Sequence, residues 1–233
     1  MIDFLRSLPR QITRFEPVTL IATFLAAGGF LLFGKLADEM VEGDLGDMDE
    51  YIFMLLREQN DPSNPIGGPQ IEVAMRDLTA LGGVTVLTII TVAVFSWLLM
   101  SRNRASAFLL LASVIGGQVL STIFKMGFSR PRPDLVPHAV EVATASFPSG
   151  HSLMSSVTYL TLAVMLASVT QMRRLKVFYF VLASVLILLV GLSRLYLGVH
   201  WPSDILAGWT LGAAWAMCVW LASKYIRYRF NAR

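Results

Sequence analysis

Two segments of this chain combine positive charge with histidine at the ends of long apolar runs. The first contains Lys125, Arg132 and His151, and the second contains Arg194 and His200. A planar guanidinium donates to two phosphate oxygens at once, whereas a lysine ammonium supplies a point charge. Charges next to hydrocarbon cost free energy unless they are paired or functional. These residues therefore favour the binding of an anion, and a phosphate ester fits them in charge and geometry.

The sequence FPSGHS at residues 147–152 is a poor beginning for an apolar helix, and its composition needs a reason. A helix that begins near Ser149 or Gly150 leaves its first backbone N–H groups without partners in the helix, and such groups attract anions. Glycine lets the anion approach the backbone because it has no Cβ. His151 would then stand beside the anion in the first turn, where we expect it to transfer a proton.

His200 and Asp204 are four residues apart, and Pro202 between them suits the first turn of a helix. In that geometry the carboxylate reaches one imidazole nitrogen, which fixes the tautomer and leaves the other nitrogen as a nucleophile. Near these loops the other carboxylates are Asp134 and Glu141, whereas a magnesium or two-metal site needs several acidic ligands. We therefore expect a reaction without a metal or another cofactor.

The elements that must position these residues are apolar helices. The chain has 233 residues, of which 55% are hydrophobic and 15% charged, and its mean hydropathy is +0.61. Such a composition is typical of a membrane protein, and each of six uncharged runs is close to the length that crosses about 30 Å of hydrocarbon. We predict an all-α polytopic fold with spanning helices at 17–36, 79–100, 105–124, 151–170, 177–193 and 205–223.

The distribution of positive charge predicts the orientation of these helices. With six spans both termini lie on one side, and twelve of the nineteen Lys and Arg residues fall on that side, in the termini and near residues 102–104 and 173–176. The positive-inside rule makes this side cytoplasmic, so the loops that carry the chemistry face outward. The first run is too long for the apolar core of a secretory signal, and we expect it to remain as a helix.

The long connection at residues 38–77 is the one segment outside the predicted spans with a pattern of its own. Met48, Tyr51, Ile52, Leu55 and Leu56 fall at helical spacing, and a second short helical pattern follows Pro69. One interpretation is a pair of helices packed on the outer end of the bundle. The other is an amphipathic lid in the membrane interface. In both, the chain forms a single membrane-embedded domain, 1–233, with its catalytic core at 79–223.

Three signatures in these segments resemble those of the type 2 phosphatidic acid phosphatase family of integral membrane lipid phosphatases. The family's K-x6-R-P stands here as KMGFSRPRP from Lys125 to Pro133. Its P-S-G-H occupies residues 148–151, and its S-R-x5-H-x3-D stands as SRLYLGVHWPSD from Ser193 to Asp204. The resemblance covers residues 79–223, whereas 38–77 carries no signature of the family.

The resemblance implies a role for each matching residue. His200 would attack phosphorus, His151 would protonate the leaving oxygen, and Asp204 would orient His200. The implied phosphate ligands are Lys125, Arg132, Arg194, Ser149 and Gly150. These roles agree with those reached from charge and spacing.

Other residues receive simpler interpretations. Arg130 lies outside the signatures; it is either an additional phosphate ligand or an interfacial charge, and we favour the interfacial charge. His138 has no partner in sequence, and we interpret it as a packing residue. Four glycines are expected to permit close helix packing: Gly116, Gly117, Gly208 and Gly212.

The resemblance and the residues together predict metal-independent hydrolysis of lipid phosphate or pyrophosphate monoesters through a phosphohistidine, at the outer face of a bacterial inner membrane. The substrate stays open among phosphatidate, phosphatidylglycerophosphate, undecaprenyl pyrophosphate and lipid A phosphates. Two alternatives are a lipid phosphotransferase and an anion transporter. The expected partners are a lipid substrate and the bilayer. The net charge of +3 reflects the cytoplasmic flanks and not a nucleic-acid surface, and the oligomeric state stays open.

Overall fold

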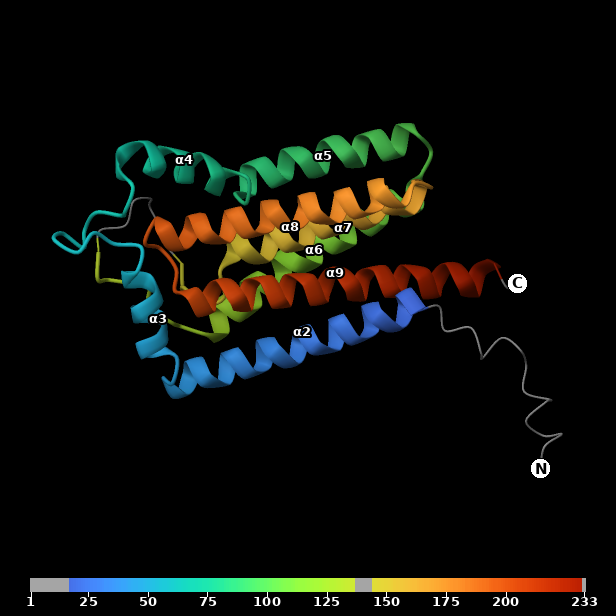
Figure 1. Ribbon diagram of the computed structural model, residues 1–233. Helices are drawn as coiled ribbons and strands as arrows, with labels where there is room; N and C mark the ends of the chain where they lie inside the picture. The colour runs from blue at the N-terminus through green and yellow to red at the C-terminus, as the bar shows by residue number, and fades with distance from the viewer. Residues whose placement is uncertain (1–16, 137–143, 232–233) are drawn as a thin grey trace, which may run out of the picture.

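The computed structural model describes residues 17–136 and 144–231, and the regular elements in these ranges are helices. Six long helices run lengthwise through the molecule, while α3 lies across one end of the bundle (Figure 1). The helices are α2 (Pro17–Glu42), α3 (Gly46–Met54), α4 (Gly68–Ala80), α5 (Val84–Met100), α6 (Arg104–Gly127), α7 (Gly150–Val169), α8 (Arg173–Tyr196) and α9 (Pro202–Asn231). The all-α prediction is confirmed.

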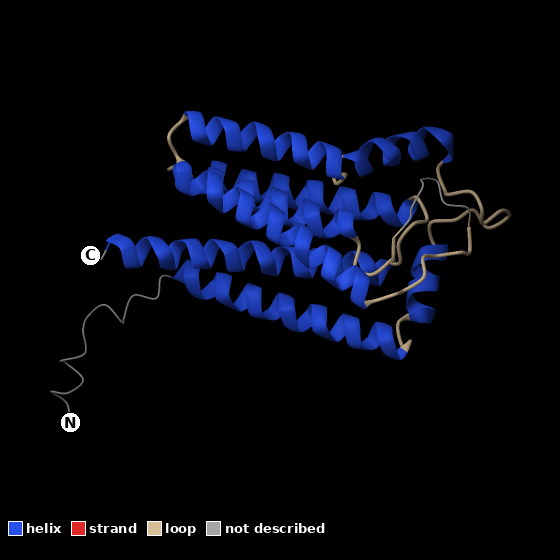
Figure 2. Ribbon diagram, turned by 180° about the vertical axis from the view of Figure 1, so that it is seen from behind, coloured by secondary structure: helices blue, strands red, loops and turns tan. Residues whose placement is uncertain are grey.

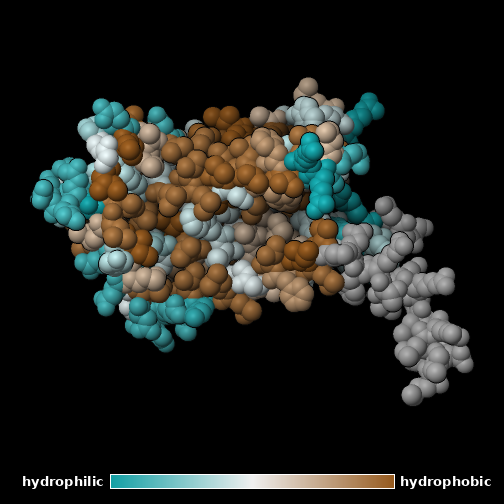
Figure 3. All heavy atoms as spheres, viewed as in Figure 1, coloured by the Kyte–Doolittle hydropathy of each residue, from teal (hydrophilic) through white to brown (hydrophobic). Residues whose placement is uncertain are grey.

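The bundle has the surface of an integral membrane protein. A broad apolar band covers its middle, and hydrophilic residues gather toward both ends (Figure 3). Within the described residues, α2, α6, α7, α8 and α9 are each long and apolar enough to cross a membrane. A sixth span exists if α4 and α5, which meet at an angle of 43°, are counted together.

This bend is a difference from the continuous helix predicted at 79–100. The chain leaves helical geometry around Gly82 and Gly83, and the Tyr159 hydroxyl donates to the carbonyl of Leu81 at 2.6 Å. A Cβ on Gly82 would lie 3.3 Å from the carbonyl oxygen of His151 and would overlap Val190. Gly82 therefore lets the bend pack directly against the beginning of α7, which counting uncharged residues could not show.

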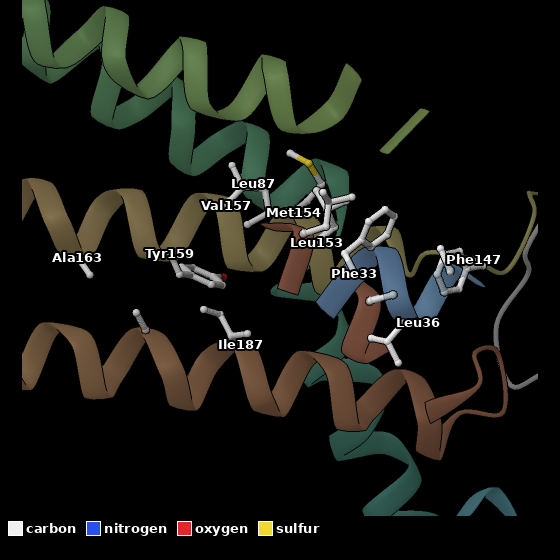
Figure 4. Packing of buried hydrophobic residues seen from close by; sticks show 14 of the residues in the cluster. Phe33, Leu36, Leu87, Phe147, Leu153, Met154, Val157, Tyr159, Ala163 and Ile187 are labelled. Carbon is white, nitrogen blue, oxygen red and sulfur yellow. The ribbon is translucent and has the colours of Figure 1, made fainter. Parts of the chain in front are cut away.

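Helix α7 is the centre of the bundle, since 61% of its apolar stretch is buried, against 22–39% in α2, α6, α8 and α9. It packs against α6, α8 and α9. Small residues permit the close contact with α9: Gly208 lies against Ser152 and Gly212 against Leu153. Around this contact, apolar side chains from α2, α5, α7 and α8 form the main core, which includes Phe33, Leu87 and Ile187 (Figure 4).

The connection between α2 and α5 packs on one end of the bundle, with α3 against α9 and α4 against α8. Of the predicted apolar stripe, Ile52 is partly buried, whereas Tyr51 and Leu55 are exposed. The buried face of α3 is formed instead by Asp49 and Phe53. The sequence therefore predicted the helix correctly, but some of the apolar residues that were expected to face the bundle are exposed.

Candidate active site

The loops that join the helices gather mainly at the end of the bundle opposite the beginning of α2 and the end of α9 (Figure 2). A cavity of about 960 Å³ begins there, and it brings together most of the residues expected to do chemistry. Six of the eight line it: Lys125, Arg132, Gly150, His151, Arg194 and His200. They come from the last turn of α6, the loop after it, the first turn of α7, the last turn of α8 and the loop before α9.

Lys125 and Arg132 are held by the same short piece of loop. The Lys125 Nζ donates to the carbonyl of Ala145 at 2.8 Å and to the Thr144 hydroxyl at 3.2 Å. The Arg132 Nε donates to the carbonyl of Thr144 at 2.9 Å. Thr144 and Ala145 were not predicted from the sequence, since carbonyl groups carry no signature. Their effect is to keep both cations at one wall of the cavity.

His200 is 1% exposed, and one of its ring nitrogens is directed to Arg132. The Arg132 Nη1 lies 3.2 Å from Nε2 of His200 and donates to the carbonyl of Val199 at 2.6 Å. Because an arginine is always protonated, Nε2 must accept, and we assign the proton of the neutral ring to Nδ1. Burial lowers the pKa of His200 to about 3, against the raising effect of Asp204. A neutral imidazole is therefore the form present at neutral pH.

Asp204 is fully buried behind His200 and accepts several hydrogen bonds. Its Oδ2 lies 3.4 Å from Nδ1 of His200, accepts from the backbone N–H of Trp201 at 2.9 Å and also accepts from the Ser146 hydroxyl. The backbone N–H of Ser149 donates to the Asp204 carbonyl at 3.0 Å. Two of the sequence signatures are thus joined directly, and Ser146 is a partner that sequence reasoning missed.

Ser149 does not occupy the position expected of a phosphate ligand. It is fully buried, it is the N-cap of α7, and its hydroxyl accepts from the Ser152 backbone at 3.4 Å and hydroxyl at 3.0 Å. A serine at this position satisfies an N–H group that the helix leaves without a partner. Ser149 therefore shapes the first turn of α7, while Gly150 and His151 face the cavity.

Arg194 enters the cavity from the last turn of α8 with donors to spare. It is 4% exposed, and its Nη1 donates to the Thr79 hydroxyl at 3.2 Å. Its Nε has no hydrogen-bond partner among the described residues. A buried guanidinium with an unused donor suits an anionic oxygen, because a donor left without a partner costs free energy.

Arg130 is the clearest correction to the sequence interpretation. Its side chain is 12% exposed, and it bridges two carboxylates, with Nη2 at 2.7 Å from Asp49 and Nη1 at 2.7 Å from Asp204. It is therefore neither an interfacial charge nor a phosphate ligand. His138 and Glu141 lie outside the described residues.

Beyond the charged residues, the cavity continues between two helices toward the apolar surface. From α5 it is lined by Val84, Leu87 and Thr88; from α6, by Val114, Ile115, Gln118, Val119, Thr122 and Met126. Val84, Val119 and Met126 are also exposed, so this side of the cavity reaches the apolar surface of the molecule. Its lining includes no residue of α3.

Carboxylates and imidazoles do not gather here as they would around a metal. Within residues 17–136 and 144–231, no three side chains of His, Cys, Asp or Glu converge as a ligand set.

A helical membrane bundle with three cations and two histidines around one cavity is suited to binding an anion such as phosphate. The model of the PAP2 superfamily matches residues 106–228, and the chain belongs to this superfamily, as its signatures predicted.

Its relatives include curated phosphatases. The chain is 32% identical over 145 residues to phosphatidylglycerophosphatase B of Bacillus subtilis. The aligned region covers 62% of this chain and 71% of that protein. It is 33% identical over 124 residues to undecaprenyl-diphosphatase of Sulfolobus acidocaldarius, over 50% of this chain and 54% of that one. The crystal structure of a PAP2-type phosphatidylglycerolphosphate phosphatase from Bacillus subtilis matches with a TM-score of 0.77 and 28% identity, over 87% of this chain and 98% of that chain.

Proposed function

We propose that this chain hydrolyses lipid phosphate or pyrophosphate monoesters without a metal, through a phosphohistidine on His200. The family and its named relatives place the chain among lipid phosphate phosphatases. The observation that carries the mechanism is one continuous cavity. It joins the His200 ring and three cations at its polar end to an apolar opening between α5 and α6.

In the first step, Nε2 of His200 attacks phosphorus while the bond from phosphorus to the lipid oxygen breaks. Arg132, which lies 3.2 Å from Nε2, would exchange this contact for a phosphate oxygen. Lys125 and Arg194 would neutralise charge on the transferring group, as cations do in other phosphoryl-transfer sites. His151 donates its proton to the leaving oxygen, so that a lipid phosphate departs as a neutral alcohol and a lipid pyrophosphate departs as the lipid monophosphate.

In the second step, water attacks the phosphohistidine and the bond between phosphorus and Nε2 breaks. His151, now neutral, accepts the proton of the water, and inorganic phosphate leaves. Nδ1–H of His200 faces Asp204 throughout, so the carboxylate stabilises the positive ring of the intermediate without taking its proton. Both histidines return to their starting states.

The apolar side of the cavity explains how a lipid reaches these residues. A lipid that moves in between α5 and α6 keeps its tails in the bilayer, whereas exposing them to water would cost about 0.8 kcal/mol per CH₂. Lateral access of this kind supports a lipid and not a soluble phosphate ester as the substrate.

The distribution of cations supports an outward-facing site. The connections from α5 to α6 and from α7 to α8 lie at the same end of the bundle as the end of α9, opposite the cavity's polar end (Figure 1). Positive charge gathers at these connections, with Arg102 in the first and Arg173 at the end of the second. By the positive-inside rule, the catalytic loops lie on the external face. Reporter fusions after residue 103 and at residue 60 would test this, with the first expected to read cytoplasmic and the second external.

The mechanism is tested by trapping its intermediate. Purified protein in detergent with EDTA is mixed with ³²P-labelled phosphatidate or phosphatidylglycerophosphate, then quenched in alkali, in which phosphohistidine is stable. We expect an acid-labile label on the protein and release of inorganic phosphate. An active enzyme that never carries label, or activity abolished by EDTA and restored by a metal, would contradict the proposal. Label transferred to an added lipid alcohol without release of phosphate would indicate a phosphotransferase.

A further inference from the structure

A chain of buried ionic contacts leads from the external connection to the catalytic histidine. Asp49 of α3 is 1% exposed and lies 2.7 Å from Nη2 of Arg130, whose Nη1 lies 2.7 Å from Oδ1 of Asp204. The other oxygen of Asp204, Oδ2, faces Nδ1 of His200. Arg130 therefore holds one oxygen of this carboxylate while the other is directed at the ring.

Ser203 strengthens the same chain at the beginning of α9. Its backbone N–H donates to Oδ1 of Asp49 at 2.8 Å, and its hydroxyl donates to Oδ2 of Asp49. The same hydroxyl accepts from Nη1 of Arg130 at 2.7 Å. Asp49 thus caps the first turn of the helix that carries Asp204, although it comes from an element far away in the sequence.

The charges explain why two carboxylates are needed. An arginine paired with Asp204 alone would cancel the negative charge that stabilises a positive imidazole ring. With Asp49 on its other side, the group of two carboxylates and one guanidinium keeps a net charge of −1. That charge balances the ring of His200 as it becomes positive in the phosphohistidine. Arg130 fixes the position of Asp204, and Asp49 restores its electrostatic effect.

We propose that Asp49 and Arg130 are positioning residues for phosphoryl transfer, which act on His200 through Asp204. This inference rests on the proposed phosphohistidine mechanism. Neither residue lines the cavity, so their effect belongs to kcat and not to KM. Asp49 also lies outside residues 106–228, the part matched by the superfamily.

The test is a double-mutant cycle on kcat, counted per active site from the burst of phosphoenzyme. We expect Asp49→Asn to lower kcat by about 10- to 100-fold with KM within about threefold of wild type. In an Asp204→Asn background the same substitution should lower kcat by less than about threefold, because residues that act through one group are not additive. Arg130→Lys keeps the positive charge but cannot bridge both carboxylates at once. We expect it to lower kcat by about tenfold with little change in KM, and to have little further effect in the Asp204→Asn background.

A matched control is Arg57→Gln. Arg57 belongs to the same connection, is 6% exposed and donates to the Tyr196 carbonyl at 2.9 Å, without a contact to Asp204. It should lower the thermal stability and leave kcat per active site within about threefold.

Two results would overturn the inference by itself: wild-type kcat in Asp49→Asn and Arg130→Lys, or losses that multiply with that of Asp204→Asn. Wild-type kcat in Asp204→Asn would instead overturn the proposed mechanism, and this inference with it.

Discussion

The segments that carry the three sequence signatures and the segments that carry none make different contributions to the same site. Signature residues such as Lys125, His151 and His200 face the cavity. Residues from segments without a signature hold charged side chains of the site in place: Asp49 pairs with Arg130, and Thr79 accepts a hydrogen bond from Arg194. The difference indicates that the chemistry is encoded locally, whereas its support is drawn from distant parts of the chain. Substitutions in the two groups should therefore differ in size and in the kinetic constant that they change.

The largest effect is expected at His200. His200→Ala removes the nucleophile, and we expect a loss of at least about 10⁴-fold in kcat with the fold retained. Phosphate release and phosphoenzyme trapping measure this, and a thermal unfolding curve checks the fold. Turnover near that of wild type would show that another group attacks phosphorus.

His151→Ala should cost less, by about 10²- to 10⁴-fold in kcat, because general acid catalysis contributes about that much. The loss should shrink with a p-nitrophenyl phosphate ester, whose leaving group needs no proton. An equal loss with both kinds of leaving group would assign His151 a role in binding and not in proton transfer.

The sequence predicted most of the residues that meet at the cavity, but not the residues that support them. The long helices and the meeting of Lys125, Arg132 and His200 follow from apolar length and from residue types that only an anion explains. Asp49 was missed because its partners lie 81 and 154 residues away. A local signal did exist, since Asp49 shares one helical face with Ile52, Phe53 and Leu56.

Three other features of the site and the fold could not be predicted from the sequence, each for a physical reason. Ser149 belongs to a signature, yet its hydroxyl caps α7 instead of facing the cavity, because capping and anion binding favour the same residue type. The bend at Gly82 was missed because uncharged residues are counted alike whether or not they continue a helix. Ser146, a single serine in a loop, had no spacing that could relate it to Asp204.

The apolar wall of the cavity should show a smaller effect that depends on the substrate. Val119→Trp narrows the opening between α5 and α6, and we expect kcat/KM for long-chain lipid phosphates in mixed micelles to fall by about tenfold. A short-chain or water-soluble ester such as glycerol phosphate should be a poor substrate that this change hardly affects.

Ile123→Trp is the matched control, since Ile123 is also exposed on α6 but does not line the cavity. It should leave both substrates unchanged. Equal loss with long and short chains in Val119→Trp would contradict lateral access.

A still smaller effect is expected at Thr79, whose hydroxyl accepts from Arg194. Thr79→Val keeps the volume and removes one hydrogen bond, so KM should rise by about three- to tenfold with less change in kcat. The control is Thr91→Val on α5, where the hydroxyl donates to the carbonyl of Leu87 in the same helix at 2.7 Å. If the two variants behaved alike, Thr79 would serve stability and not the position of Arg194.

The smallest expected effect is the response of His200 to acid. A nucleophile must be neutral, and burial lowers the pKa of His200 to about 3. The ring should therefore stay neutral as the pH falls from 8 to 5, with its proton on Nδ1 because Arg132 donates to Nε2.

The chain has three histidines, so ¹⁵N-histidine NMR of the double variant His138→Gln and His151→Gln reports His200 alone. We expect shifts of an Nδ1–H tautomer that do not titrate above pH 5. Titration with a midpoint near 6.5, the ordinary value for histidine, would mean that water reaches the ring. The acid limb of the rate profile would then lie close to neutral pH, and the buried pair of His200 and Asp204 would no longer explain how the nucleophile is kept ready.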